Sequence, residues 1–172
     1  SIPNSVTSIG DNAFESSGIT SVHLPNSVTH IGDFAFYDSQ LSATLTIPTT
    51  VTEIGSNAFS YCSKLSKVLY NAISAECYGS SSFSSIFYSS SVYTLIIGNE
   101  VQKIPAFAFS NTDNIETITI PESVTYIGSH AFYLCSLLTE VNYNATNVSY
   151  CGDSPFNGSN KLTTFNIGNN VQ

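Results

Sequence analysis

Hydrophobic residues recur along this chain at a nearly fixed interval. A block that places valine, isoleucine, alanine and phenylalanine at the same points, as in SVTSIGDNAF, occurs in five clear copies and two divergent ones. The clear copies end at Phe14, Phe36, Phe59, Phe109 and Phe132, and the divergent ones at Phe83 and Phe156. The steps between these phenylalanines are 22 to 26 residues. A period of this size is typical of a solenoid, in which each repeat buries its apolar edge against its neighbours.

A second pattern precedes each block. Short stretches rich in branched residues alternate apolar with polar positions, as at Ile118 and Ile120, which is typical of a half-buried strand. Strands about 23 residues apart, each joined to the next by a return path, must lie parallel at a spacing of about 4.8 Å. The predicted strand regions are Ile19–Pro25, Leu45–Pro48, Leu65–Asn71, Val92–Gly98, Ile115–Pro121, Leu138–Asn144 and Leu162–Gly168.

The block itself predicts the return path. Its valine, isoleucine, alanine and phenylalanine point inward, so that like residues stack in ladders, and Gly128 is expected to supply a turn with permissive φ. A short strand, a turn or a single helical turn fits this segment, because no long amphipathic helix is present. Residues 1–172 are therefore predicted to form one mainly β solenoid of seven coils plus a partial eighth. Neither end has a polar cap, so we expect a longer array.

The pattern L-x-x-[IV]-x-[IL]-P-x-S-V-T-x-I-G-x-x-A-F-x-x-C resembles the leucine-rich repeats of the BspA-like family. The copies ending at Phe83 and Phe156 depart from it, since Asn71 and Asn144 replace the proline. The resemblance implies a right-handed leucine-rich-repeat horseshoe that is secreted or displayed at a cell surface and used in adhesion to matrix proteins or other cells. It supplies no catalytic motif. The match is clearest at Ile19–Ser39, Leu45–Cys62 and Ile115–Cys135.

Composition narrows the classes of partner. Hydrophobic residues make up 42% of the chain, enough to bury a core, but charged residues make up only 9%. Four lysines and no arginine stand against twelve acidic residues, which gives a net charge of −8. Nucleic acid and anionic membrane surfaces both require clustered cations, so neither is expected as a partner. No apolar run reaches the length of about 18 residues that would insert into a bilayer.

The four cysteines form two similar pairs, Cys62 with Cys77 and Cys135 with Cys151. Cys62 and Cys135 are three coils apart, roughly 14 Å at the strand spacing, so the four thiols do not form one zinc site. A disulfide within each pair stays open, because each pair spans neighbouring coils. Free core thiols are favoured, since Cys62 and Cys135 fall in a ladder of small residues and Cys151 takes an isoleucine position.

The remaining polar residues give no convergent chemistry. His30 and His130 are four coils apart, on the order of 19 Å, and the solvated surface accounts for them and for His23. No G-x-S-x-G elbow is present, so we predict no catalytic residue, no metal site, no cofactor and no enzymatic activity. Possible glycosylation sequons begin at Asn144, Asn147 and Asn157.

The outward positions of the predicted strands are the candidate binding residues, and we call this surface the strand face. Leu69 and Ile96 fall on adjacent strands and are expected to form an exposed apolar spot between threonine rows. The irregular coil is expected to bring Phe87, Tyr88 and Tyr93 nearby, which suits protein recognition. The strand face comprises Ser21, His23, Thr44, Thr46, Lys67, Leu69, Thr94, Ile96, Thr117, Thr119, Glu140 and Asn142.

These observations predict a non-enzymatic protein–protein interaction module. Its expected ligand is an extracellular or cell-surface protein, and its expected location is the cell surface or the extracellular space. Two alternatives stay open. The chain is a structural spacer if the threonine rows only satisfy β-propensity on a wet sheet. It is a glycan-binding module if tyrosine, asparagine and threonine side chains stack on sugars and hydrogen-bond them.

Overall fold

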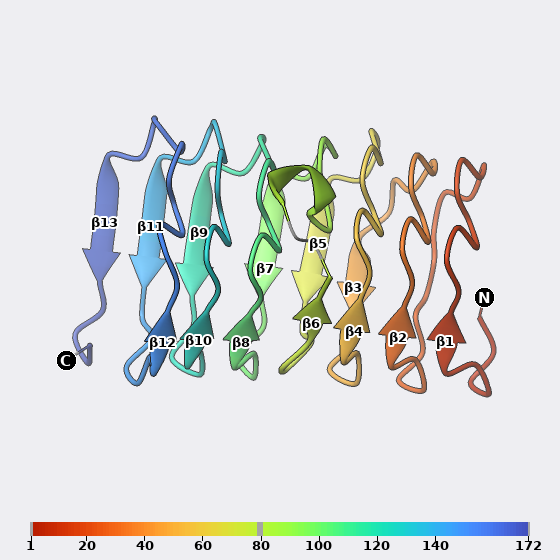
Figure 1. Cartoon of the computed structure of the whole chain (residues 1–172), viewed down its shortest axis with the longest axis horizontal. Coiled ribbons are helices and arrows are strands. Elements are labelled where there is room, and N and C mark those ends of the chain that lie inside the picture. The colour runs from red at the N-terminus through yellow and green to blue at the C-terminus, as the bar shows by residue number, and fades with distance from the viewer. Residues whose placement is uncertain (1, 79–80, 172) are drawn as a thin grey trace.

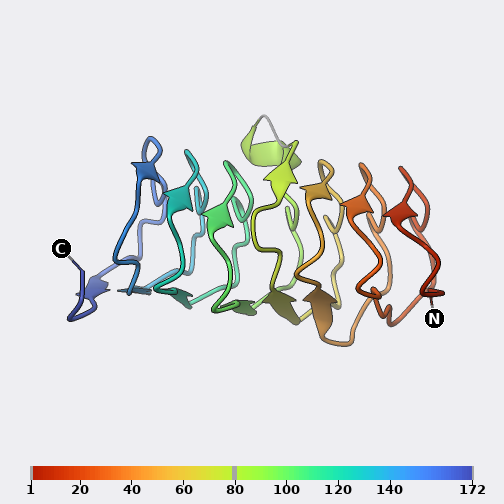
Figure 2. The same ribbon diagram turned by 90° about the horizontal axis from the view of Figure 1, so that it is seen from below.

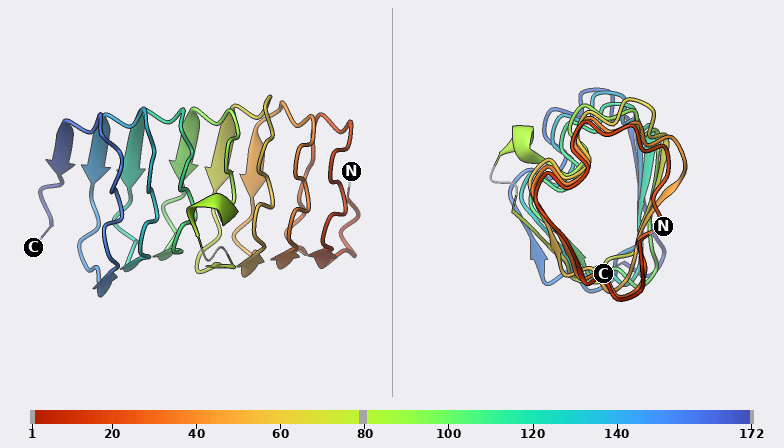
Figure 3. Two further views of the ribbon diagram at one scale, coloured as in Figure 1. Left: turned by 45° about the horizontal axis from the view of Figure 1, so that its top comes forward. Right: turned by 90° about the vertical axis from the view of Figure 1, so that its right-hand side faces the viewer.

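The computed structural model describes residues 2–78 and 81–171. The chain winds into coils that follow one another along a single long axis (Figure 1). Viewed along that axis, the coils superimpose around a common interior (Figure 3). The predicted β-solenoid with parallel strands is confirmed.

Each coil contributes at most two short strands, and the described residues contain one helix, the single 3-10 turn η1 (Ser82–Ser84). This agrees with the expectation of a mainly β return path. The strands are β1 (Ser8–Ile9), β2 (His30–Ile31), β3 (Leu45–Ile47), β4 (Glu53–Ile54), β5 (Lys67–Tyr70), β6 (Glu76–Cys77), β7 (Thr94–Ile97), β8 (Lys103–Ile104), β9 (Thr117–Ile120), β10 (Tyr126–Ile127), β11 (Glu140–Tyr143), β12 (Tyr150–Cys151) and β13 (Thr164–Ile167).

The strands form two parallel arrays on different sides of the coil (Figure 2). One array, which we call the SVT face, has the orders β1-β2-β4-β6 and β8-β10-β12, and the strand face has the orders β3-β5-β7 and β9-β11-β13. Among the described strands, β7 pairs only with β5 and β8 only with β10. Proline contributes to the gap after β7, because Pro121 has no N–H at the position where Gly98 and Asn144 each donate to the preceding coil at 2.9 Å.

The interior is a stack of like side chains, as the repeat predicts. Successive phenylalanine rings lie 4.9–6.2 Å apart, centroid to centroid, and are stacked within 25° of parallel. Isoleucines such as Ile31 and Ile54 form a second fully buried ladder in register. The phenylalanine ladder consists of Phe14, Phe36, Phe59, Phe87, Phe109, Phe132 and Phe156.

The assignment of Phe83 to this ladder is wrong. Phe87 is fully buried and stacks between Phe59 and Phe109, whereas Phe83 is 67% exposed. The closed stack has no room for extra residues, so the turn η1 projects outward (Figure 3); residues 79–80 of the serine-rich insertion lie outside the described residues. The same shift places Ser90, three residues after Phe87, in the ladder of small residues.

The glycine of the repeated IG pair is required for space. A Cβ atom on Gly128 would lie 2.2 Å from the backbone nitrogen of Ala106, and one on Gly55 would lie 2.3 Å from that of Asp33. The expectation that Gly128 supplies a turn with permissive φ is wrong, because its φ is not positive and its role is close approach between coils. Positive φ occurs instead at positions two residues before and two after the ladder phenylalanines: Asn12, Ser16, Phe34, Asp38, Asn57, Tyr61, Ser89, Phe107, Asn111, His130, Leu134, Ser154 and Gly158.

Candidate binding face

Strands β3, β5 and β7 place their outward side chains in straight rows. Thr46 lies opposite Leu69, and Leu69 lies opposite Ile96 on the next strand. Lys67 lies opposite Thr94 in the second row. Ile96 is 44% exposed and Leu69 is half-buried, while the alternate residues of these strands point into the core. Leu69 and Ile96 thus form an apolar spot in the middle of the strand face.

Strands β9, β11 and β13 continue the face with polar residues. Thr117 lies opposite Glu140, and Thr119 lies opposite Asn142. The Nδ2 group of Asn166 donates to Glu140 Oε1 at 2.8 Å and to Asn142 Oδ1 at 2.9 Å. This half of the face therefore carries an internally hydrogen-bonded network beside the apolar spot.

Ser21 and His23 are exposed at the other end of the face, but their segment forms no strand. Backbone hydrogen bonds from Ser42 and Ala43 to the carbonyl of Thr20 hold the two coils together at this point. The next coil carries one residue more before its proline, LSATLTIP against ITSVHLP, so the ladder does not continue. The predicted strand at residues 19–25 is therefore absent, and the rows of the strand face begin at β3.

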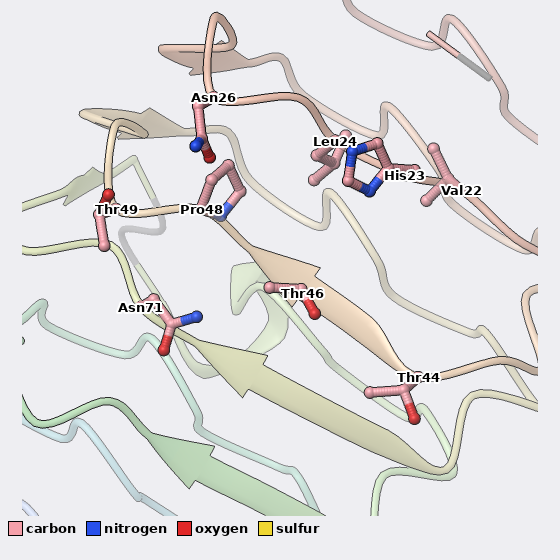
Figure 4. Close-up of a pocket in the computed structure, with 9 residues that line it drawn as sticks. All are labelled: Val22, His23, Leu24, Asn26, Thr44, Thr46, Pro48, Thr49 and Asn71. Atoms are coloured by element: carbon pink, nitrogen blue, oxygen red, sulfur yellow. The ribbon is translucent and has the colours of Figure 1, made fainter.

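A groove opens where this strand pairing lapses. It has a volume of about 370 Å³ and lies between residues 22–26 and β3 (Figure 4). His23 belongs to one wall, Thr44 and Thr46 belong to the other, and Asn71 reaches in from the following coil. Three predicted residues of the strand face thus line a cavity that the sequence does not predict.

Two further hollows, of about 320 and 390 Å³, continue this groove along the ends of the strands. Thr49 and Asn71 line both the first and the second hollow, and Asn99 lines both the second and the third. Glu100 and Glu122 add carboxylates toward the far end, where β7 and β9 are unpaired. We call the three together the strand-end groove. Its lining is rich in amide and hydroxyl groups, which hydrogen-bond neutral polar ligands.

Of the three aromatic residues expected beside the apolar spot, one lies next to β7. Tyr93 immediately precedes β7 and is 60% exposed. Phe87 is buried in the phenylalanine ladder. The Tyr88 ring contacts Tyr61 and Phe83 at the turns around the ladder phenylalanines, which we call the phenylalanine turns. The expectation for Phe87 and Tyr88 is wrong because it rests on the same misassigned register as Phe83.

The SVT face satisfies its own polar groups. His30 Nδ1 lies 2.8 Å from Glu53 Oε2, and Lys103 pairs with Glu76 while lying over the ring of Tyr126, 4.9 Å from its centroid. The ring of Tyr150 on β12 stacks on the ring of Tyr126 on β10, with the two centroids 4.6 Å apart. Charges and rings on this face are thus partnered within the chain, whereas the apolar spot of the strand face is open.

All four cysteines are free thiols. Cys62 and Cys135 are fully buried, and each Sγ donates to the carbonyl of a ladder phenylalanine in the preceding coil at 3.2 Å. Burial raises the pKa of Cys135 to about 12, so it is protonated and unreactive at neutral pH. Cys77 and Cys151 take the isoleucine positions opposite β4 and β10. The disulfide alternative is not adopted, and Cys151 is exposed rather than in the core.

The other candidate residues do not converge. His130 stacks on Phe107 at 5.1 Å, far along the chain from His30. Within residues 2–78 and 81–171, no group of three or more histidine, cysteine or acidic side chains could hold a metal ion. In the same part of the chain, no helix has the length and apolar character needed to cross a membrane.

The three sequon asparagines differ in exposure. Asn147 and Asn157 are exposed, whereas Asn144 is half-buried and lines the strand-end groove. A Cβ atom on Gly168 would lie 2.7 Å from the Oδ1 atom of Asn144. A Cβ atom on Gly98 would approach the Oδ1 atom of Asn71 in the same way. Asparagine thus replaces the strand-ending proline where the next coil carries a glycine.

The family model of the BspA type leucine rich repeat region matches residues 1–92 and 80–172 in six copies. A leucine rich cell surface protein from Faecalibacterium prausnitzii has 21% identity and a TM-score of 0.59, over 96% of this chain and 52% of that one. A leucine-rich repeat protein from Bacteroides ovatus has 23% identity and a TM-score of 0.53, over 99% and 55%. The leucine-rich repeat protein of T. pallidum has 22% identity and a TM-score of 0.58, over 93% and 69%.

These structural likenesses, all below 25% identity, establish the fold alone, and the chain spans about half the length of the first two structures. No curated protein matches the chain. Proteins of this repeat family are typically non-enzymatic protein-interaction or surface proteins. Because the family model covers the chain from end to end, this protein belongs to the BspA-type leucine-rich repeat family.

Proposed function

We propose that the chain is a non-enzymatic module that binds an extracellular or cell-surface protein through its strand face. The observation that supports this most is the apolar spot, in which Leu69 and Ile96 lie in register with Thr46 and beside Thr94. An aliphatic anchor surrounded by small polar side chains suits the centre of a protein interface.

The contrast between the two sheet faces supports the same choice. The charged groups of the SVT face pair with each other, so little would be gained by covering them. The apolar spot instead has surface to remove from water, which is worth about 25 cal/mol per Å² before the costs of association are counted. The strand-end groove beside it is concave and can receive a side chain or backbone segment of the partner.

Adhesion at a cell surface is the role we propose for this binding. One structure with the same fold is described as a leucine rich cell surface protein. A surface rich in serine, threonine and asparagine, with few cations, also suits contact with proteins rather than with nucleic acid.

Surface plasmon resonance against a panel of extracellular matrix proteins tests the proposal. The double variant Leu69→Asp/Ile96→Asp is expected to weaken binding at least tenfold, which corresponds to about 1.4 kcal/mol. Tyr150→Asp is the matched control, because Tyr150 is a 46% exposed aromatic residue on β12 of the SVT face. The affinity of this variant for the matrix protein is expected to equal that of the wild type. If the double variant folds and binds like the wild type, the strand face is a spacer surface.

Glycan recognition is a second candidate, favoured by the strand-end groove. Amide and hydroxyl groups line it across several coils, and neutral sugars are hydrogen-bonded by such groups. A glycan array separates the two functions, with Asn99→Ala as the test variant because Asn99 lines two of the three hollows. Binding to a neutral glycan that this variant loses, together with no binding to any protein, would favour the glycan function.

A further inference from the structure

The phenylalanine turns impose an unusual backbone conformation on every coil. At these turns, residues two before and two after the ladder phenylalanine have φ between 48° and 79°, except at Phe87, where Ser85 has a φ of −68°. Phe34 N donates to Ser56 O at 2.9 Å, and Tyr61 N donates to Tyr88 O at 2.9 Å, in each case across to the next coil. The left-handed conformation therefore aims these N–H groups along the solenoid axis. The regular coils adopt this conformation whichever residue occupies the position.

The residues at these positions fall into two groups. Glycine, asparagine, aspartate and histidine adopt the left-handed region most readily; for other residues it costs about 1–2 kcal/mol, and a bulky side chain there is an outlier. Phe34, Tyr61, Phe107 and Leu134 have φ of 54°, 58°, 55° and 56° and belong to the costly group. Inter-coil bonding does not need a large side chain there. Phe107 stacks on His130 within the chain, so Phe34 and Tyr61 are the aromatic residues that point to a role outside the fold. The remaining positions carry small or polar residues: Asn12, Ser16, Asp38, Asn57, Ser89, Asn111, His130, Ser154 and Gly158.

Two of these strained aromatic residues belong to a continuous row of rings, which we call the aromatic ridge. The ring centroids of Phe34 and Tyr37 are 5.4 Å apart, and those of Tyr37 and Tyr61 are 5.2 Å apart. Tyr61 then contacts Tyr88 at 5.6 Å, and Tyr88 contacts Phe83 at 5.7 Å. Tyr61 is 42% exposed and Phe83 is 67% exposed. Five rings from three coils thus form one surface, away from both strand arrays.

The electrostatic surroundings of the ridge are acidic. Glu15 occupies the position of Tyr37 in the preceding coil, and Asp38 occupies that of Tyr61; both carboxylates are exposed. No lysine occupies either row, and the chain contains no arginine. Aromatic ring faces attract lysine and arginine side chains, and a net charge of −8 attracts them over longer range.

We propose that the aromatic ridge is a second binding surface, whose occupant is an arginine- or lysine-bearing segment of a protein partner. The cationic side chains lie over the rings of Tyr37, Tyr61 and Tyr88, and the carboxylates of Glu15 and Asp38 complement their charge. This surface is independent of the strand face, so one solenoid can engage two proteins or two parts of one partner.

Matched peptides test the inference on the whole chain. Fluorescence anisotropy is measured with three labelled peptides of one sequence that carry arginine, lysine or the neutral isostere citrulline. The arginine and lysine peptides are expected to bind at least tenfold more tightly than the citrulline peptide, and added salt is expected to weaken them. Equal binding of the arginine and citrulline peptides, or binding of neither, overturns the proposal without any variant having to fold.

Substitution by asparagine separates recognition from packing. Tyr61→Asn introduces a residue suited to the left-handed region. It is expected to lower the affinity for the arginine peptide at least fivefold without lowering the urea midpoint of unfolding. Phe107→Asn relieves the same strain outside the ridge and is expected to leave peptide affinity unchanged. The Leu69→Asp/Ile96→Asp variant is also expected to keep full peptide binding, so failure of the strand-face proposal remains distinguishable. Unchanged peptide affinity in Tyr61→Asn, or an equal loss in Phe107→Asn, contradicts the inference.

Discussion

Replacing Phe109 by alanine tests the stacked-ring core in the middle of the solenoid. Phe109 is fully buried, and its ring lies 6.2 Å from Phe87 on one side and 5.4 Å from Phe132 on the other. The ring of Tyr70 meets it edge-on at 5.2 Å. Truncation therefore removes contacts with two neighbouring coils and with β5 at once.

The expected loss of stability follows from these contacts. Replacing a buried phenylalanine by alanine costs about 3–5 kcal/mol. Each aromatic pair contributes about 0.5–1.5 kcal/mol, and the cost of the replacement already includes part of this contribution. With three ring partners and no exposure, Phe109→Ala is expected in the upper part of the range, about 4–5 kcal/mol. Phe14 has one ring partner, Phe36 at 5.0 Å, and is partly exposed. Phe14→Ala is expected to cost about 1–2 kcal/mol.

Urea unfolding followed by far-UV circular dichroism measures both variants, and hydrogen exchange shows where protection is lost. Because each coil contacts only its neighbours, Phe109→Ala is expected to reduce protection first in β8, β9 and β10. Equal losses for the two variants would show that the ring ladder does not transmit stability from coil to coil. A larger loss for Phe14→Ala would refute the reasoning.

Three further predictions concern single positions. Tyr70→Phe is expected to raise stability by about 1 kcal/mol in urea unfolding, because the Tyr70 hydroxyl is buried without a hydrogen-bond partner among the described residues; a loss would contradict this. Gly55→Ala is expected to lower stability by about 1–3 kcal/mol because its Cβ would lie 2.3 Å from a backbone nitrogen, whereas Gly10→Ala, with open space around it, is expected to be neutral or stabilising; similar outcomes for both would refute the close-approach argument. Burial raises the pKa of the Cys135 thiol from an ordinary 9.0 to about 12, so the stability that this thiol contributes is present below pH 9 and is lost as the pH rises toward 12. Cys135→Ser is expected to reduce this alkaline loss of stability. An unchanged dependence of stability on pH would contradict the prediction.

The sequence predicts the fold well because a repeat must bury the same positions in every coil. Phe36, Phe59 and Phe132 lie in one ladder, and Ile31 and Ile54 in another, as their spacing requires. The free state of buried Cys62 and Cys135 agrees with their place among small residues. Periodicity thus carries most of the architecture.

Periodicity fails where residues are inserted. Regular spacing favours Phe83 for the ladder, but Ile86 and Phe87 are buried and Phe83 is exposed. The strand-end groove arises in a similar way, from one extra residue before Pro48 and from the missing N–H of Pro121. Each effect depends on the register between neighbouring coils, which a single repeat does not reveal.

The sequence pattern also does not predict which residues adopt the left-handed conformation. Glycine normally marks positive φ, and Gly128 invited that interpretation. The coil instead places asparagine, serine and even Phe34 in this region, because inter-coil hydrogen bonding dictates the backbone there. The aromatic ridge becomes visible only when these conformations are compared across coils.

Methyl NMR during titration with a binding protein tests the proposed strand face most directly. The methyl groups of Leu69 and Ile96 are expected to shift first and furthest, while those of buried Ile127 stay in place. Shifts at Leu134 on the phenylalanine turns, with Leu69 and Ile96 unchanged, would contradict binding through the strand face.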